Sequence, residues 1–78
     1  MNLSEALILR IESLCKEKGI TPNRLATQAG VTQSTIDSIL KSKSTNPRLQ
    51  TMIKIAAGFG MSLEQFLDFP EWKNISDD

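Results

Sequence analysis

The chain of 78 residues contains no histidine, one cysteine and few aromatic residues. Without histidine, and with Cys15 as the only thiol, it has no cluster of the usual metal ligands and no nucleophile paired with an imidazole base. It also has no glycine-rich loop of the kind that cradles phosphate groups. We therefore expect neither an enzyme nor a protein that binds a metal or a cofactor, and we expect Cys15 to be a core thiol, with a redox switch as the alternative.

Long apolar segments are also missing. No apolar run approaches the roughly 20 residues that a membrane-spanning helix needs, and the N-terminus does not have the pattern of a signal peptide. A single cysteine cannot form an internal disulfide, which agrees with a reducing compartment. These features predict a cytoplasmic protein that does not contact a membrane.

Valine occurs once, at Val31, whereas leucine, isoleucine and alanine are common. This composition favours helix over sheet. Apolar residues recur at helical spacing and predict one compact bundle of five helices, an all-α fold. The expected helices span about residues 3–18, 22–29, 33–41, 47–59 and 63–67. We predict a domain over residues 1–69 and a short acidic tail, loosely held from Glu71 onward, over residues 70–78.

Several residues are predicted to start or stop these helices. Ser4 or Asn2 is expected to cap the first helix, and Gly19 to end it. The second helix is predicted to begin with Thr21 as its N-cap and Pro22 at its first position. The remaining expected N-caps are Thr32, Asn46 with Pro47 as first helical residue, and Ser62.

The fourth helix is expected to bury one stripe of side chains. Its apolar residues Leu49, Met52, Ile53 and Ala56 follow the spacing i, i+3, i+4, i+7. Gly58, near its end, should reduce helix stability by up to about 1 kcal/mol.

Net charge is formally zero, but the charges are unevenly distributed. The segment from Arg10 to Lys54 carries eight basic and three acidic residues, whereas the segment after Lys54 carries one basic and five acidic residues. A basic body with an acidic tail can present a basic face to nucleic acid, and a dispersed set of solvated charges is the alternative.

The segment from Thr21 to Val31 predicts a short helix followed by a tight turn at Gly30, and Thr32 then caps the next helix. Two helices joined so closely cross at a steep angle. In that geometry one helix lies across a DNA backbone while the next enters the major groove. The spacing therefore favours a helix-turn-helix unit.

The chain from about Ile20 to Leu67 resembles the Cro and phage-repressor family of helix-turn-helix proteins, also called the XRE type. The matching residues are Leu25-Ala26, Ala29 to Ile36, Asn46-Pro47, Leu49, Ile53, Ile55-Ala56, Phe59-Gly60 and Ser62 to Phe66. The resemblance implies a lambda-repressor-like five-helix domain and a sequence-specific regulator that binds double-stranded DNA as a homodimer, of bacterial or phage origin and associated with the nucleoid. Three positions depart from the family pattern: Ser42 in place of the glycine that often ends the third helix, the short Ser38, and Gly58.

The resemblance makes Gln33 the first residue of the recognition helix, with Ser34 and Ser38 at other base-facing positions. Glutamine can pair with the adenine edge in two hydrogen bonds, and Thr35 offers a methyl group and a hydroxyl. Phosphate contacts are expected from three basic residues, Lys41, Lys43 and Arg48, and from three polar residues, Asn23, Ser44 and Thr45. Insertion of Arg48 into a narrow minor groove is the alternative for that residue. The N-cap Thr32 is also expected to belong to the DNA-binding surface. Asp37 fits a DNA-facing surface poorly unless it accepts from cytosine. Ordinary solvated polar residues are the alternative for the whole set.

Two aromatic residues, Phe69 and Trp72, follow the last predicted helix. They either fold onto the bundle or form part of a dimer contact, because exposed aromatic side chains often mark interfaces. The alternative function is a protein-interaction module, such as an antitoxin-like binder, that holds its partner through this C-terminal tail.

Overall fold

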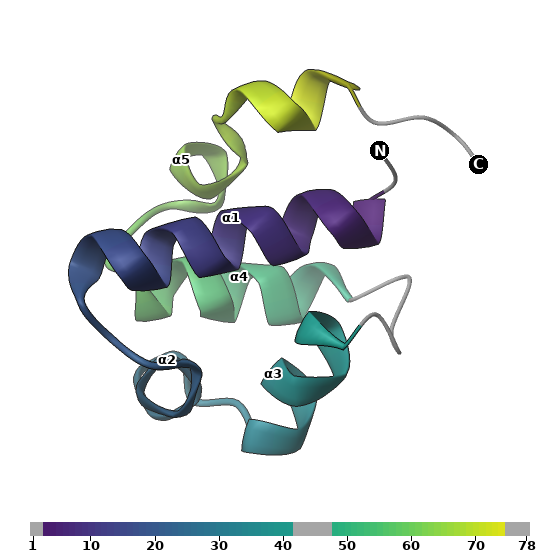
Figure 1. Cartoon of the computed structure of the whole chain (residues 1–78). Coiled ribbons are helices and arrows are strands. Elements are labelled where there is room, and N and C mark those ends of the chain that lie inside the picture. Colours follow the sequence, from purple (N-terminus) through teal and green to yellow (C-terminus); the bar gives the residue numbers. More distant parts are fainter. Residues whose placement is uncertain (1–2, 42–47, 75–78) are drawn as a thin grey trace.

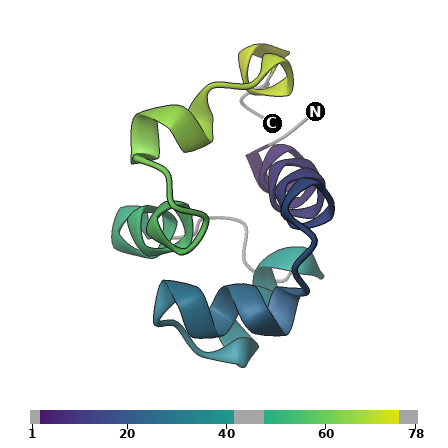
Figure 2. The same ribbon diagram turned by 90° about the vertical axis from the view of Figure 1, so that its left-hand side faces the viewer.

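The computed structural model describes residues 3–41 and 48–74 of the chain, without the side chains of Trp72 and Asn74. These residues form five α-helices and one short 3-10 helix, with no strand among them: α1 (Leu3–Lys18), α2 (Pro22–Ala29), α3 (Gln33–Leu40), α4 (Leu49–Gly58), α5 (Leu63–Leu67) and η1 (Pro70–Asn74). Figures 1 and 2 show three tiers, with α2 and α3 at one end, α1 and α4 in the middle, and α5 and η1 at the other end. The expected all-α fold with five helices is confirmed.

The core is built from side chains of all five α-helices. On α1, Leu7, Ile11 and Leu14 are buried as the helical spacing predicts. The other fully buried large side chains are Leu25, Ile36, Ile55 and Phe66. Burying an aliphatic or aromatic side chain of this size contributes roughly 1.5–3 kcal/mol, so a chain this small depends on contributions from every helix.

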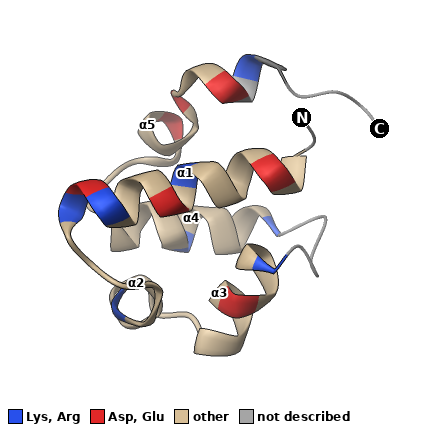
Figure 3. Ribbon diagram, in the orientation of Figure 1, with Lys and Arg blue, Asp and Glu red and all other residues tan. Residues whose placement is uncertain are grey.

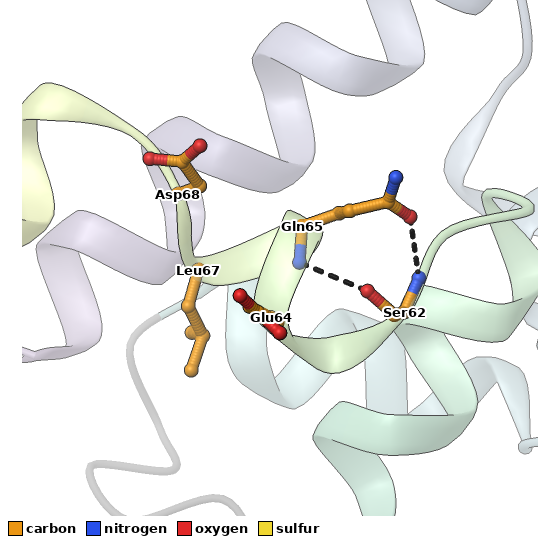
Figure 4. A pocket seen from close by; sticks show the side chains of 5 residues that line it. All are labelled: Ser62, Glu64, Gln65, Leu67 and Asp68. Atoms are coloured by element: carbon orange, nitrogen blue, oxygen red, sulfur yellow. Dashed lines mark hydrogen bonds between the residues drawn. The ribbon is translucent and has the colours of Figure 1, made fainter.

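Local sequence signals set most helix ends as expected. Gly19 and Gly30 have φ of 65° and 71°, the left-handed conformation that ends a helix at little cost only for glycine. Thr21 caps α2, with Pro22 at the first helical position. Ser62 and Gln65 form a capping box at the start of α5: the Gln65 N–H donates to the Ser62 hydroxyl at 3.1 Å, and the Ser62 N–H donates to the Gln65 side chain at 2.9 Å (Figure 4).

One candidate cap of α1 is excluded, and the expected end of the third helix is wrong. Ser4 lies inside α1 and is buried, so it does not cap the helix, and its hydroxyl has no partner among the described residues. The third helix ends at Leu40 with Lys41 as its C-cap at a φ of −95°, and not with Ser42 as the C-cap. Because Lys41 keeps a negative φ, the C-cap needs no left-handed residue. Ser42 and the other candidate cap of α1, Asn2, lie outside the described residues.

The predicted start of the fourth helix is also wrong, and so are two of the four residues of its predicted buried stripe. Arg48 is the N-cap, so the helix begins at Leu49 and not at Pro47; Asn46 and Pro47 lie outside the described residues. Leu49 and Ile53 are exposed, whereas Ile55 and Phe59 are buried. The helix is apolar on two flanks, so the spacing i, i+3, i+4, i+7 holds from Met52 as well as from Leu49. Packing against the other helices buries the stripe that starts at Met52, which consists of Met52, Ile55, Ala56 and Phe59.

Gly58 has a packing role that the sequence did not reveal. A β-carbon added at Gly58 would lie 2.9 Å from the N, Cα and Cβ atoms of Ala29, closer than real β-carbons approach other atoms. The helices α2 and α4 therefore contact each other at these two small residues. Glycine lowers the intrinsic stability of α4, but it allows the two helices to pack closely.

The segment after α5 is more ordered than predicted. Phe69 is 7% exposed and belongs to the core. Of the two alternatives for Phe69, folding onto the bundle is therefore the one that the structure shows. Residues 70–74 form η1, which contacts α1. The expectation of a loose tail from Glu71 is therefore wrong as far as Asn74. The side chain of Trp72 is not among those described.

Candidate nucleic-acid interface

The turn between α2 and α3 has the geometry that the sequence predicts for a helix-turn-helix unit. Gly30 is the left-handed C-cap of α2, and its N–H donates to the Thr27 carbonyl at 3.3 Å. The Val31 N–H donates to the Ala26 carbonyl at 3.1 Å, and its half-buried side chain packs against the core. This turn holds α3 at the end of the molecule farthest from α5 and η1 (Figure 1).

The start of α3 is held by Thr32. Its hydroxyl accepts the Thr35 N–H at 3.1 Å and lies 2.9 Å from the Thr35 hydroxyl. Thr35 is half-buried, and its hydroxyl is engaged by the Thr32 hydroxyl within the cap. By contrast, Gln33 and Ser34 are exposed, and their side chains make no hydrogen bond within the described part of the chain. The first turn of α3 therefore presents two uncommitted polar side chains.

One face of α3 carries four of the predicted site residues together with Asp37. With 3.6 residues per turn, five side chains fall within an arc of about 140°, opposite the buried Ile36 and Ile39. These side chains belong to Gln33, Ser34, Asp37, Ser38 and Lys41. Asp37 and Ser38 are half-buried, whereas Lys41 is exposed. Asp37 lies near the middle of this arc and places one negative charge among polar neighbours.

The remaining predicted residues lie on other elements. Asn23 is exposed in the first turn of α2, and Arg48 is exposed as the N-cap of α4. The N-termini of helices favour anions because their first N–H groups lack helical partners. The other three predicted residues, Lys43, Ser44 and Thr45, lie outside the described residues.

Arg10 does not belong to the expected basic face. Its Nε donates to the Phe66 carbonyl at 2.8 Å, one terminal nitrogen donates to the Gln65 carbonyl at 3.0 Å, and the guanidinium lies 5.1 Å from the centre of the Phe69 ring. This side chain fastens α5 and Phe69 to α1. Figure 3 shows that the acidic residues of α5 and η1 also lie at this end, away from α3.

Arg24 and Gln28 were not among the predicted site residues. Both line a hollow beside the start of α2, together with Gly19, Ile20 and Thr21. With its amide oriented to satisfy both neighbours, Gln28 donates to the Gly58 carbonyl at 3.0 Å and accepts from Arg24 Nε at 3.3 Å. Arg24 and Gln28 are four residues apart in the sequence. This spacing places two side chains on one face of a helix and could have predicted their contact.

Cys15 is buried, as expected for a core thiol. Burial, with a smaller contribution from the carboxylate of Glu12, raises the pKa of the thiol above its ordinary value of 9.0. Within residues 3–41 and 48–74 there is no group of three or more histidine, cysteine, aspartate or glutamate residues placed to hold a metal ion. Over the same residues, no helix combines the length and apolarity needed to cross a membrane.

Comparison with known proteins agrees with this geometry. Residues 10–71 match the family described as the Cro/C1-type HTH DNA-binding domain. The HTH-type transcriptional regulator SinR of Bacillus subtilis strain 168 is 39% identical over 59 residues, which are 76% of this chain and 53% of SinR. The chain thus spans about half the length of this curated relative.

Solved structures show the same fold. The prophage Lp1 protein 11 superposes with a TM-score of 0.80 at 32% identity, covering 92% of this chain and 96% of that protein. SinR in complex with DNA superposes with a TM-score of 0.69 at 37% identity, covering 80% of this chain and 98% of that chain. SinR in a complex with the SinI protein gives a TM-score of 0.71 at 32% identity, covering 91% and 68%.

Proposed function

The chain belongs to the family of Cro/C1-type HTH DNA-binding domains, and from this premise we propose that it is a transcriptional regulator that binds a specific double-stranded operator. The observation that carries the proposal is the first turn of α3, where Gln33 and Ser34 are exposed and uncommitted at the free end of the molecule. The proposal involves binding alone and assigns no catalytic step to the chain.

In the proposed complex α3 lies in the major groove and α2 crosses the adjacent backbone. Gln33 pairs with N6 and N7 of an adenine, a contact that discriminates against the wrong base by roughly 1–3 kcal/mol. Ser34 and Ser38 offer hydroxyls that donate or accept, so they tolerate more than one base. The Thr35 methyl group contacts a thymine methyl group, because the Thr35 hydroxyl is engaged by Thr32.

Phosphate contacts would surround this helix. Lys41 and Arg48 are exposed and positively charged, and Asn23 is an exposed amide in the first turn of α2. Lys43, Ser44 and Thr45 remain proposed phosphate ligands in the segment between α3 and α4. We assign no phosphate contact to Arg10, which is engaged elsewhere.

Asp37 would act as a filter in this arrangement. A carboxylate near the groove repels phosphate and accepts a hydrogen bond only from a donor such as cytosine N4. Its place in the arc of α3 therefore favours operators with a cytosine within its reach and disfavours other sequences.

The regulator is further proposed to act as a homodimer on a palindromic site, in the manner of a repressor, in a bacterial or phage-derived setting close to the nucleoid. A single copy offers one recognition helix among the described residues, which reads one half-site. Residues 1–69 would form the DNA-binding domain and residues 70–78 the acidic tail, with η1 anchored on α1.

A second candidate function is the binding of a protein partner. The relative SinR occurs in a complex with the SinI protein as well as with DNA, which favours this candidate. The acidic tail would be the binding element here. A chain that ends after Phe69 keeps that core residue, so loss of a partner with unchanged DNA binding would support this candidate.

An amide NMR titration of the labelled chain with mixed-sequence duplex DNA at two salt concentrations tests the main proposal. We expect shifts at residues 32–38 and at Asn23, Lys41 and Arg48 that weaken steeply with salt. A folded protein without shifts at low salt would refute DNA binding. Shifts confined to α5 and η1 would place the contact elsewhere.

A further inference from the structure

A hollow of about 410 Å³ lies between α1 and the start of η1, at the end of the molecule away from α3 (Figure 1). This volume falls within the range of about 300–1,000 Å³ that is typical of small-molecule pockets. None of the residues proposed to contact DNA is among its described lining residues. Six described residues line this α1–η1 hollow: Leu9, Arg10, Ser13, Phe69, Pro70 and Glu71.

The α1–η1 hollow has an apolar wall. Leu9 is 43% exposed, although large aliphatic side chains on α1 are otherwise mostly buried, and Pro70 is also exposed. Covering such side chains with an apolar group removes them from water, which is favourable. Phe69 is buried in the core and holds this wall in place. The wall therefore favours a ligand that has an apolar part.

Arg10 supplies a fixed positive charge to the hollow. Its Nε and one terminal nitrogen donate to the carbonyls of Phe66 and Gln65, and its guanidinium lies 5.1 Å from the centre of the Phe69 ring. A guanidinium has five N–H donors, and these two bonds leave its other terminal nitrogen without a bond to any described residue. The two carbonyls carry no net charge. Arg10 is therefore held in one position and keeps N–H groups that can bind a carboxylate.

Glu71 supplies a negative charge from the η1 side of the same hollow. It is half-buried, and its carboxylate forms no hydrogen bond or ion pair with a described residue, Arg10 included. The exposed Ser13 adds a hydroxyl that can donate or accept. Two opposite charges thus line one small hollow without pairing with each other. A ligand that carries an ammonium group close to a carboxylate is complementary to both charges.

We propose that the α1–η1 hollow binds a free amino acid with an aliphatic or aromatic side chain. Arg10 binds the carboxylate, Glu71 binds the ammonium group, and the side chain of the ligand covers Leu9. The ligand would link α1 to η1, which already contacts α1. Because the hollow and α3 lie at opposite ends of the molecule, the amino acid and a DNA duplex can be bound together.

Amide NMR titration of the labelled full chain with L-leucine, up to about 10 mM, tests the proposal. We expect saturable shifts at Leu9, Arg10, Ser13 and Glu71 and none at residues 32–38. Two analogues each lack one charged group of leucine: 3-methylbutylamine lacks the carboxylate, and 4-methylpentanoate lacks the ammonium group. Each should bind at least about tenfold more weakly, because one charge-assisted contact is lost. Glycine, without the apolar side chain, should also bind more weakly.

Variants of the hollow supply a second test. Glu71→Gln should weaken binding of L-leucine by at least about tenfold, but it should not weaken binding of 4-methylpentanoate, which has no ammonium group. Glu64→Gln is the matched control, because Glu64 is an exposed acid of α5 outside the hollow, and it should bind L-leucine as the parent does. Arg10 is kept in all variants because it also fastens α5 to α1.

Three results would overturn the proposal. The first is the absence of saturable shifts with both L-leucine and L-phenylalanine. The second is equally tight binding of L-leucine and either analogue, because one charge would then suffice. The third is a Glu71→Gln protein that binds L-leucine as the parent does. Shifts at residues 32–38 with duplex DNA test operator binding separately, so either proposal can fail while the other holds.

Discussion

Ala29 and Gly58 are in direct backbone contact: a β-carbon built on Gly58 would lie 2.9 Å from three atoms of Ala29, two of them backbone. Backbone atoms cannot rotate out of the way as the end of a flexible side chain can. The helix-turn-helix unit thus packs on α4 at a point where α4 has no room for a residue larger than glycine.

The first prediction concerns Gly58→Ala. Helix propensity alone would make this change stabilising by up to about 1 kcal/mol, but the clash with Ala29 should make it destabilising by about 1–3 kcal/mol. Urea unfolding followed by circular dichroism measures the difference. As a control, the exposed Ala57→Gly should show the ordinary propensity loss of up to about 1 kcal/mol. A Gly58→Ala protein that is more stable than the parent would contradict the close contact.

The second prediction concerns Arg10. Arg10→Ala removes two hydrogen bonds to carbonyls of α5 and the contact with the Phe69 ring, and it should lower the free energy of unfolding by about 2–3 kcal/mol. Hydrogen exchange should show faster opening of α5 and η1, with α2 and α3 unchanged. The exposed Lys16→Ala should have little effect. A large loss of DNA affinity at full stability would instead place Arg10 on the DNA.

The third prediction separates base reading from phosphate binding. Gln33→Ala should reduce discrimination at one position of each half-site by about 1–3 kcal/mol, whereas Arg48→Ala should weaken binding to all sequences. Arg48→Ala should also reduce the slope of affinity against salt by about one unit. Binding to randomised duplexes at several salt concentrations measures both effects. If both variants bind like the parent, the interface assignment is wrong.

The fourth prediction concerns the cap of α3. Thr32→Ala removes the side-chain acceptor for the Thr35 N–H and should cost about 1 kcal/mol, whereas Thr32→Ser keeps the hydroxyl and most of the stability. Thermal unfolding distinguishes the two variants. Equal melting temperatures for alanine and serine would show that the cap contributes nothing measurable.

The fifth prediction concerns Cys15 and alkaline pH. Because burial raises the pKa of the Cys15 thiol in the folded state, the folded protein binds this proton more tightly than the unfolded chain. The contribution of this proton to the free energy of unfolding is fully present below the ordinary pKa of 9.0. It is lost as the pH rises through the pKa of the thiol in the folded state. The stability difference between the parent and Cys15→Ala should therefore shrink above pH 9.0. A difference constant across alkaline pH would refute the shift.

Features with short-range causes were predictable from the sequence. The bounds of α1, the caps Thr21, Thr32 and Ser62, and the left-handed Gly30 each depend on one or two residues and their immediate neighbours. The exposure of Gln33 and Ser34 was predictable for the same reason, because both follow a cap at the start of a helix. The family resemblance supplied the prediction that they contact bases, and the comparisons confirm that family.

The sequence by itself determined the five α-helices found over the described residues, where most of them begin and end, and that two of them make a helix-turn-helix unit. Tertiary structure alone decided which flank of α4 is buried, that Gly58 meets Ala29, and that Arg10 and Phe69 fasten α5 to α1. Caps and helical spacing act over a few residues, so they can be read along the chain. Contacts between residues far apart in the sequence depend on how whole helices pack. The two apolar stripes of α4, which start at Leu49 and at Met52, have the same spacing, so only the packing of α4 against other helices decides which stripe is buried.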